Sequence, residues 1–201
     1  FKDIRIRQAL SLAINRQEMV DILFFGYGKI CNGPFLPDSF AYNENIKPIT
    51  QDINKAKALL KDAGYDENNP FTFELVTNTG NDTRINAAQI LQYQLEKTGV
   101  KMSIKVMEWQ AFLNTVVHPK KFQAVLLGWS LALMPDAFPL WHSSSSKLGG
   151  FNLVSYENEK VDKLIEQGST TINRDELGNI YKEIFKIITD DLPYLFLYIP
   201  D

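Results

Sequence analysis

The sequence is short of the residues on which several kinds of site depend. It has one cysteine and two histidines in 201 residues, so it cannot form an internal disulfide, and it argues against a zinc site with the usual ligands. The formal net charge of −3 offers no basic patch for a phosphate backbone. No apolar run approaches the roughly 18 residues that a membrane-spanning helix needs.

The residues that are present indicate an ordinary globular chain, long enough for one large domain or two small ones. Apolar residues at helical spacing predict an amphipathic helix over 6–14. Asn15, with a glutamate three residues later, resembles a capping box and predicts that a second helix follows. A stretch rich in glycine, proline and asparagine predicts a long loop over 26–48. Asp52 then caps a third helix, which Gly64 ends.

From residue 71 onward the pattern alternates between strands and helices. The predicted strands are 71–78, 101–109, 122–129 and 194–199. The second strand is expected to direct Met102, Ile104 and Val106 inward, and the third is apolar on both faces, which predicts a central position. Strands separated by helices of this length predict an α/β layer with parallel strand pairs.

Helix starts between these strands are marked by polar residues. Asp82 is predicted to cap the helix after the first strand, and Asn158 and Asn173 to begin two later helices. Acidic pairs at 157/159 and 175/176 suit the helix dipole, which predicts solvated or capping roles. The pair at 190/191 lies at a helix end against the dipole, and the sequence offers no account of it.

Hydroxyls and a histidine are adjacent in the run of serines 143–146 after His142, which leaves a small α/β hydrolase open as a different class of function. The sequence has no Gly-x-Ser-x-Gly elbow, and a sequence neighbour is expected to be a poor geometric partner for a base. Cys31 lies in the long loop without a catalytic signature, so it is predicted to be a lone thiol. We expect it to be shielded by its own loop or by another part of the protein.

Aromatic residues provide a stronger signal than these groups. Three predicted strands end at Asn78, Trp109 and Trp129, and ligands of open α/β sheets bind outside the carboxyl ends of the strands. Gly128 allows a close backbone approach, and a polar residue follows Trp129, so we expect a cleft there, with Asn78 and Trp129 left uncovered.

Six segments in order resemble one family across essentially the whole chain. They are RIRQALSLAINRQEMVD, LLKDAGY, LQYQLEKTGVKMSIKVMEW, FQAVLLGWSLALMPDAFPLWHSS, NLVSYENEKVDKLIEQ and LPYLFLYIP. Together they resemble the extracellular solute-binding proteins of the peptide/nickel ABC-transporter class. The resemblance implies an α/β lobe of the type II periplasmic-binding-protein kind, with a mixed, mostly parallel sheet and helices on both faces. Residues 1–201 are then expected to be a single lobe excised from a longer two-lobed protein.

The same resemblance implies a binding function outside the cytoplasm, with no catalytic residues, cofactor or metal. The implied partners are a peptide or other small ligand, the permease subunits and the missing N-terminal lobe, in a protein that is periplasmic or a membrane-anchored lipoprotein. The residues expected to contact the ligand are Asn78, Trp129, Ser130, Leu131, Asp136, Trp141, Asn152 and Tyr156.

One departure from the family pattern concerns the ligand's amine. In peptide-binding members an aspartate about three residues past the tryptophan pairs with the α-amino group, and that position here is Ala132. Oligopeptides remain the expected ligand, with oligosaccharides or other solutes as the alternative, because the tryptophans suit either sugar rings or peptide side chains. The apolar loop predicts an uncharged or N-blocked group at this place.

Overall fold

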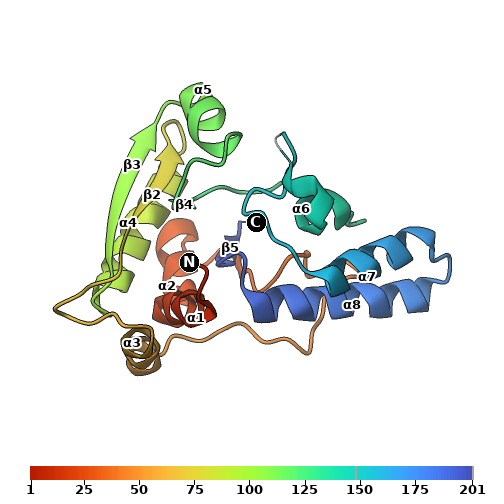
Figure 1. Cartoon of the computed structure of the whole chain (residues 1–201), viewed down its shortest axis with the longest axis horizontal. Coiled ribbons are helices and arrows are strands. Elements are labelled where there is room, and N and C mark those ends of the chain that lie inside the picture. The colour runs from red at the N-terminus through yellow and green to blue at the C-terminus, as the bar shows by residue number, and fades with distance from the viewer. Residues whose placement is uncertain (148, 201) are drawn as a thin grey trace.

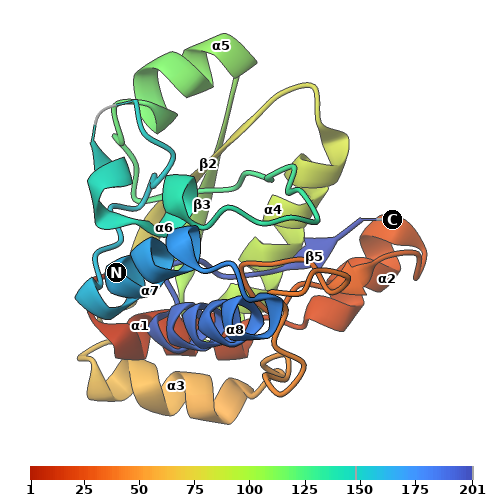
Figure 2. The same ribbon diagram turned by 90° about the vertical axis from the view of Figure 1, so that its right-hand side faces the viewer.

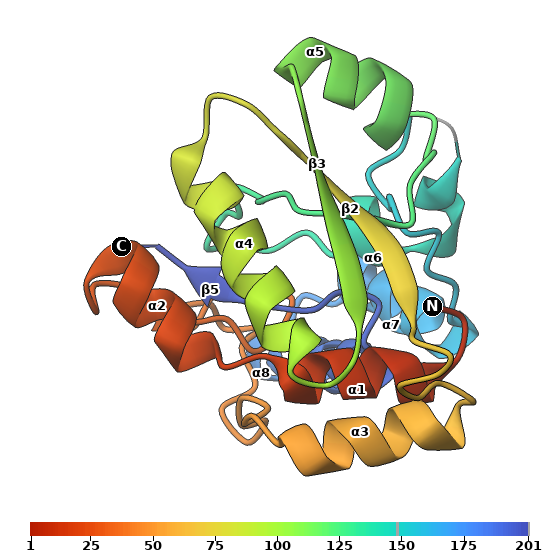
Figure 3. The same ribbon diagram turned by 90° about the vertical axis from the view of Figure 1, so that its left-hand side faces the viewer.

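A computed structural model describes residues 1–147 and 149–200 of the chain. Its larger sheet has three parallel strands in the order β3-β2-β4: β2 is Thr72–Asn78, β3 is Lys101–Met107 and β4 is Ala124–Val125. The long arrows of β2 and β3 lie side by side in Figure 3. The parallel pairing and the intervening helices confirm the predicted α/β class.

The predicted central position of the third strand is wrong. β2 is the middle strand, and β4 pairs with it over only two residues at the edge. The segment is apolar on both faces because Leu126 packs into the cluster on one side of the sheet, while Val125 and Leu127 pack into the cluster on the other. The apolar pattern of this segment therefore arises because each of its faces packs against a hydrophobic cluster, and not because strands flank it on both sides.

The helices of the first half begin close to where the sequence predicts. They are α1 (Ile4–Ala13), α2 (Arg16–Phe24), α3 (Ile53–Asp62), α4 (Asp82–Glu96) and α5 (Trp109–Phe112), the last continuing as a π-turn over Leu113–Val117. Asn15 and Asp52 accept backbone hydrogen bonds as N-caps of α2 and α3. The cap of α4 is Asn81 and not Asp82, because the Asn81 side chain accepts from the backbone N–H of Arg84.

Helices cover both faces of the sheet. Phe73 and Leu75 point into a large cluster with α1, α3 and α4, whereas Val76 points the other way, toward Phe112 and the π-turn. Met102 belongs to the large cluster, but Val106 is 40% exposed and does not reach it, so its predicted inward position is wrong. The burial of β3 therefore falls toward its carboxyl end.

A second region is built around a pair of helices. The long antiparallel helices α7 (Glu159–Thr170) and α8 (Arg174–Asp191) extend to the right in Figure 1 and face the viewer in Figure 2. The short α6 (Phe138–Trp141) and part of the 34–46 loop pack against them. A 3-10 turn over Ser143–Ser146 is joined to α7 by the backbone N–H of Ser143, which donates to the Asp162 carboxylate at 2.9 Å. Asn158 and Asn173 cap α7 and α8 as predicted.

The C-terminal segment runs between the two regions and does not join the larger sheet. Only Tyr198–Ile199 forms a strand, β5, which pairs antiparallel with β1 (Lys29–Ile30) inside the predicted loop. Within residues 1–147 and 149–200 the helices lack the combination of length and apolar character that crossing a bilayer requires.

Candidate ligand-binding site

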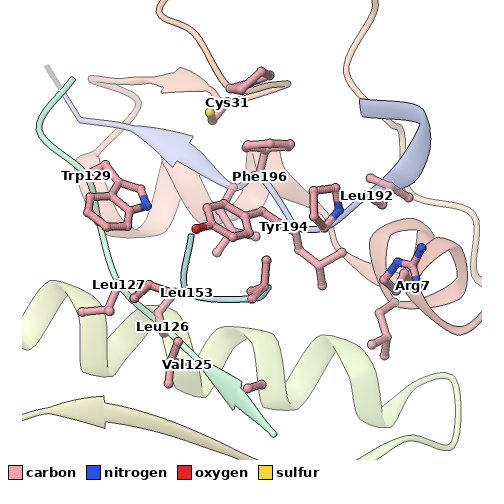
Figure 4. Close-up of a pocket in the computed structure, with 18 of the residues that line it drawn as sticks. Arg7, Cys31, Val125, Leu126, Leu127, Trp129, Leu153, Leu192, Tyr194 and Phe196 are labelled. Atoms are coloured by element: carbon pink, nitrogen blue, oxygen red, sulfur yellow. The ribbon is translucent and has the colours of Figure 1, made fainter. Parts of the chain in front are cut away.

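A cavity of about 1280 Å³ lies between the sheet and the helical region. In Figure 4 the chain from Val125, the last residue of β4, to Trp129 forms one wall, and the C-terminal segment with Leu192, Tyr194 and Phe196 forms the opposite one. Leu153 lies between them. Apolar and aromatic side chains dominate the labelled walls, which is typical of a site for an organic ligand.

Trp129 is the best placed of the predicted contacts. Its indole is 39% exposed, lines the cavity and meets the ring of Phe151 edge-on at 6.0 Å. The hydroxyl of Tyr194 points toward it in Figure 4. Burial raises the pKa of Tyr194 to about 12, although the indole of Trp129 acts in the opposite direction by donating toward the phenol oxygen.

Leu131 also lines the cavity and packs partly against the helical cluster. Ser130 is exposed and is not among the lining residues. Asp136 is exposed as well, and its carboxylate accepts the backbone N–H of Phe138 at 3.0 Å, which fixes the start of α6. Ser130 and Asp136 therefore lie outside the cavity walls.

Asn78 does not have the uncovered position that the sequence analysis expects. Its side chain is only 5% exposed, accepts a hydrogen bond from the guanidinium of Arg84 and donates to the carbonyl of Thr79 at 2.7 Å. The first turn of α4 covers the end of β2, a tertiary contact that strand patterning alone does not reveal.

Asn152 is fully buried and its amide is used within the chain. It donates to the carbonyls of His142 and Tyr156 at 3.2 and 2.8 Å and accepts the backbone N–H of Tyr156 at 2.8 Å. Its side chain closes the loop between α6 and α7, so the expectation that it offers a free polar group to a ligand is not met.

Tyr156 lines the cavity, but its hydroxyl is bound to the carboxylate of Asp191 at 2.6 Å. Burial and this hydrogen bond raise the pKa of the phenol. Asn158 donates to the same carboxylate oxygen at 2.9 Å, and Arg7 donates to the Asp191 carbonyl. These hydrogen bonds explain why an acidic residue, Asp191, is tolerated at the end of α8 despite the helix dipole. Its neighbour Asp190 forms an ion pair with Lys186 at 2.6 Å.

Trp141 lines the cavity, but its ring is covered by other side chains. The sequence predicts instead a ring open to stacking against the ligand. Trp141 is 2% exposed and enclosed by Tyr156, Tyr194 and Phe196, the nearest ring centroid being that of Tyr194 at 4.8 Å. Trp109 begins α5 instead of ending a strand, is 39% exposed and does not line the cavity.

Lys120 and Arg84 are cationic residues of the cavity walls that the sequence pattern does not point to. Lys120 donates to the carbonyls of Ser146 and Asn152 at 2.5 and 2.7 Å and to the hydroxyl of Ser155, and burial lowers its pKa. Arg84 lines the cavity beside Gly128. A basic residue in the first turn of the helix after a strand is the signal that could have found Arg84.

The histidine–serine pair is closer than expected from its sequence spacing. Nδ1 of His142 lies 2.8 Å from the Ser144 hydroxyl, and Nε2 lies 3.4 Å from a carboxylate oxygen of Glu166. The backbone N–H of Ser144 donates to the same Nδ1 at 3.1 Å, so the imidazole caps the 3-10 turn. None of these three residues lines the cavity.

Cys31 is half-buried, with its sulfur 3.4 Å from the carbonyl of Gly33, and burial raises the pKa of its thiol. It lies beyond the C-terminal segment in Figure 4. Across the described part of the chain, histidine, cysteine and acidic residues form no group of three that could hold a metal ion.

Comparisons with known proteins identify the family. The model of the bacterial extracellular solute-binding proteins, family 5 Middle, matches residues 1–151. The oligopeptide-binding protein AppA of Bacillus subtilis is 35% identical over 214 residues, covering 100% of this chain and 39% of that protein. A solved structure of AppA from Bacillus subtilis in complex with a nonapeptide has a TM-score of 0.92 at 34% identity, covering 100% of this chain and 42% of that one.

A structure of NikZ from Campylobacter jejuni in complex with Ni(L-His) has a TM-score of 0.90 at 28% identity, covering 99% of this chain and 42% of that one. The chain thus spans about two-fifths of the length of the relatives that it matches. Its α/β architecture is that of the type II periplasmic binding proteins. The chain belongs to the bacterial extracellular solute-binding proteins of family 5.

Proposed function

We propose that this chain is one lobe of the substrate-binding component of an ABC importer, which binds oligopeptides in a cleft between two lobes and delivers them to the permease. The observation that carries the proposal is the match along the whole chain to AppA in complex with a nonapeptide. The size of the cavity supports the proposal. Its volume of about 1280 Å³ exceeds the roughly 300–1,000 Å³ typical of sites for drug-sized molecules, so it has room for a larger ligand such as an oligopeptide.

The proposal includes a location and a mode of action. The protein works outside the cytoplasm, in the periplasm or attached to the membrane as a lipoprotein, and it binds and releases its ligand without chemical turnover. Closure of the second lobe supplies contacts and excludes water, so this lobe alone binds only weakly, with a dissociation constant of about 1 mM.

The direct test uses the full-length protein. Mass spectrometry of the ligand that co-purifies, followed by calorimetry with that ligand, should identify a peptide, and parallel titrations should include a short oligosaccharide and nickel–histidine. Tight binding of either of these, without peptide binding, would overturn the peptide assignment. Hydrolysis of a generic ester or peptide, lost in Ser144→Ala, would instead support an enzyme.

The composition of the loop after Trp129 predicts whether the amino end of the ligand is charged. Ala132, Leu133 and Met134 are exposed, and the loop from 130 to 135 contains no carboxylate to pair with an ammonium group. An ammonium group enclosed against this loop by the second lobe would lose hydration without compensation. We therefore expect Ala132→Asp to strengthen the binding of free-amine peptides about tenfold over N-acetylated ones, measured by calorimetry. Strong discrimination in favour of the free amine by the wild type would show that the amine binds elsewhere.

A further inference from the structure

An aromatic corner at the end of α2 projects into solvent. We define this corner by Ile22, Phe25 and Tyr27, whose side chains are 54%, 88% and 74% exposed. Single exposed apolar side chains are common on protein surfaces, and Ile172 at the tip of the α7–α8 hairpin is one of them. Three large apolar side chains within six residues, two of them aromatic, form a group of the kind that marks an interaction surface.

The backbone holds the aromatic corner in a fixed shape. Phe25 has a φ of 54°, in the left-handed region that a bulky residue rarely adopts, and Gly26 follows with a φ of 83°. The backbone N–H of Tyr27 donates to the carbonyl of Phe24 at 2.8 Å, and β1 begins two residues later and pairs with β5. The chain therefore adopts a costly conformation that leaves one phenylalanine outside, while the ring of its neighbour Phe24 packs on that of Tyr198 at 5.0 Å.

The aromatic corner borders the cavity. Phe24 lines the cavity together with Tyr198 and Ile199 of β5. A Cβ atom at Gly28 would lie 3.1 Å from the carbonyl oxygen of Ile199, so the turn of the corner lies directly against the wall that the C-terminal segment forms. The end of α2 lies beside β5 in both Figure 2 and Figure 3. Whatever covers this wall of the cavity therefore reaches the corner as well.

We propose that the second lobe of the same protein packs on the aromatic corner. The inference rests on the proposed function, and it names a contact between the lobes that involves no ligand. The relatives are long enough to supply this partner, because the chain spans about two-fifths of their length. An apolar surface on the second lobe is the complement that fits, since the three side chains of the corner carry no charge.

The first test measures thiol labelling in the full-length protein, as purified and with its co-purified ligand in place. Phe25→Cys, Tyr27→Cys and the matched control Ile172→Cys, at a 98% exposed position, are each treated with a maleimide. Mass spectrometry identifies the modified site and separates it from Cys31. We expect the two corner thiols to react about tenfold or more slowly than the thiol at position 172, because the second lobe excludes the reagent.

Thermal stability provides an independent measurement. Phe25→Ser in the full-length protein should lower Tm by about 2 to 4 °C, because it removes a ring that the second lobe covers. Ile172→Ser removes a fully solvated apolar side chain and should change Tm by less than about 1 °C. An unchanged or raised Tm in Phe25→Ser would show that the ring lies in water and would overturn the proposal.

Other occupants of the corner give different labelling results. A second copy of the protein would make the protection depend on protein concentration, and a permease would protect the corner only in vesicles that hold the transporter. Either result would overturn the proposal, as would labelling of the corner as fast as at position 172. Fast labelling with peptide binding intact overturns the contact alone. Slow labelling in a protein that binds an oligosaccharide or nickel–histidine and no peptide overturns the proposed ligand and leaves the contact in place.

Discussion

The two hydrophobic clusters on either side of the cavity differ in the side chains that compose them. The cluster on the sheet is dominated by aliphatic side chains from α1, α3 and α4 packed on Phe73, Leu75 and Met102. The cluster of the helical region is richer in aromatic rings: Phe35 packs against Tyr181 and Phe185 of α8, and Trp141 belongs to the same cluster. One is a layered α/β core, and the other is a helical pair closed by a loop.

The C-terminal segment connects these clusters because its successive side chains point alternately into one and the other. Leu195 and Leu197 pack against the sheet cluster, whereas Tyr194 and Phe196 pack against the helical cluster. Its backbone is held in part by a buried arginine, because Arg16 donates to the carbonyl of Phe196 at 2.7 Å. One wall of the cavity is therefore part of a layered core, and the other is an extended segment held between two cores.

The largest effect is expected from removing this arginine. Arg16 is 5% exposed and also donates to the carbonyls of Ser11 and Ile49, so Arg16→Met leaves buried oxygens without donors. We expect the free energy of unfolding to fall by about 2 to 4 kcal/mol, measured by urea denaturation. Arg174→Met, at an exposed helical position, is the matched control and should change it by less than about 0.5 kcal/mol. A similar small change in both variants would show that the segment does not depend on Arg16.

The helical cluster can be tested at its closest approach to the loop. A Cβ atom at Gly33 would overlap the ring of Phe185. We expect Gly33→Ala to cost about 1 to 3 kcal/mol in the wild type through overpacking. In a Phe185→Ala background the added methyl group has room, so its cost should vanish, and the double-mutant cycle should report the difference as coupling. Equal costs in both backgrounds would mean that backbone movement, not the ring, limits the site.

These contrasts explain which parts of the fold the sequence predicts. The caps at Asn15, Asp52, Asn158 and Asn173 are correct because a cap depends on residues within one turn of itself. The predicted strand over 194–199 is mostly wrong, although its alternation is real. Two clusters satisfy that alternation, and a sequence pattern does not say whether a cluster or a strand lies alongside.

The residues of the site also divide into those that the sequence can place and those that it cannot. Trp129 and Leu131 could be placed at the cavity because an apolar strand ends there, with Gly128 before the tryptophan and a polar residue after it. Asn78 and Asn152 could not, because what covers them comes from Arg84 and from the α6–α7 loop, which folding brings close. Polar residues near a strand end thus serve the ligand or the chain depending on contacts that only the tertiary structure shows.

An intermediate effect is expected where the β4 wall meets the α6–α7 loop. Lys120 joins them through its bonds to Ser146, Asn152 and Ser155. Lys120→Met should lower the free energy of unfolding by about 1 to 2 kcal/mol and speed hydrogen exchange in residues 149–155. Lys121→Met changes the exposed neighbour and should do neither. Unchanged exchange in Lys120→Met would show that the loop holds its place through packing.

The smallest effect concerns how tightly the C-terminal wall is closed around Tyr194. Its folded pKa of about 12 lies above the ordinary value of about 10, so its contribution to stability is complete below pH 10 and is lost as the pH rises through about 12. Subtracting the tyrosinate titration of Tyr194→Phe from that of the wild type should isolate one step near pH 12. In denaturant the missing step should return to about pH 10, which controls for the assignment. A step near pH 10 in the folded protein would mean that the segment opens readily enough for water to reach the phenol, and that this wall, unlike the one on the sheet, is not closed without a ligand.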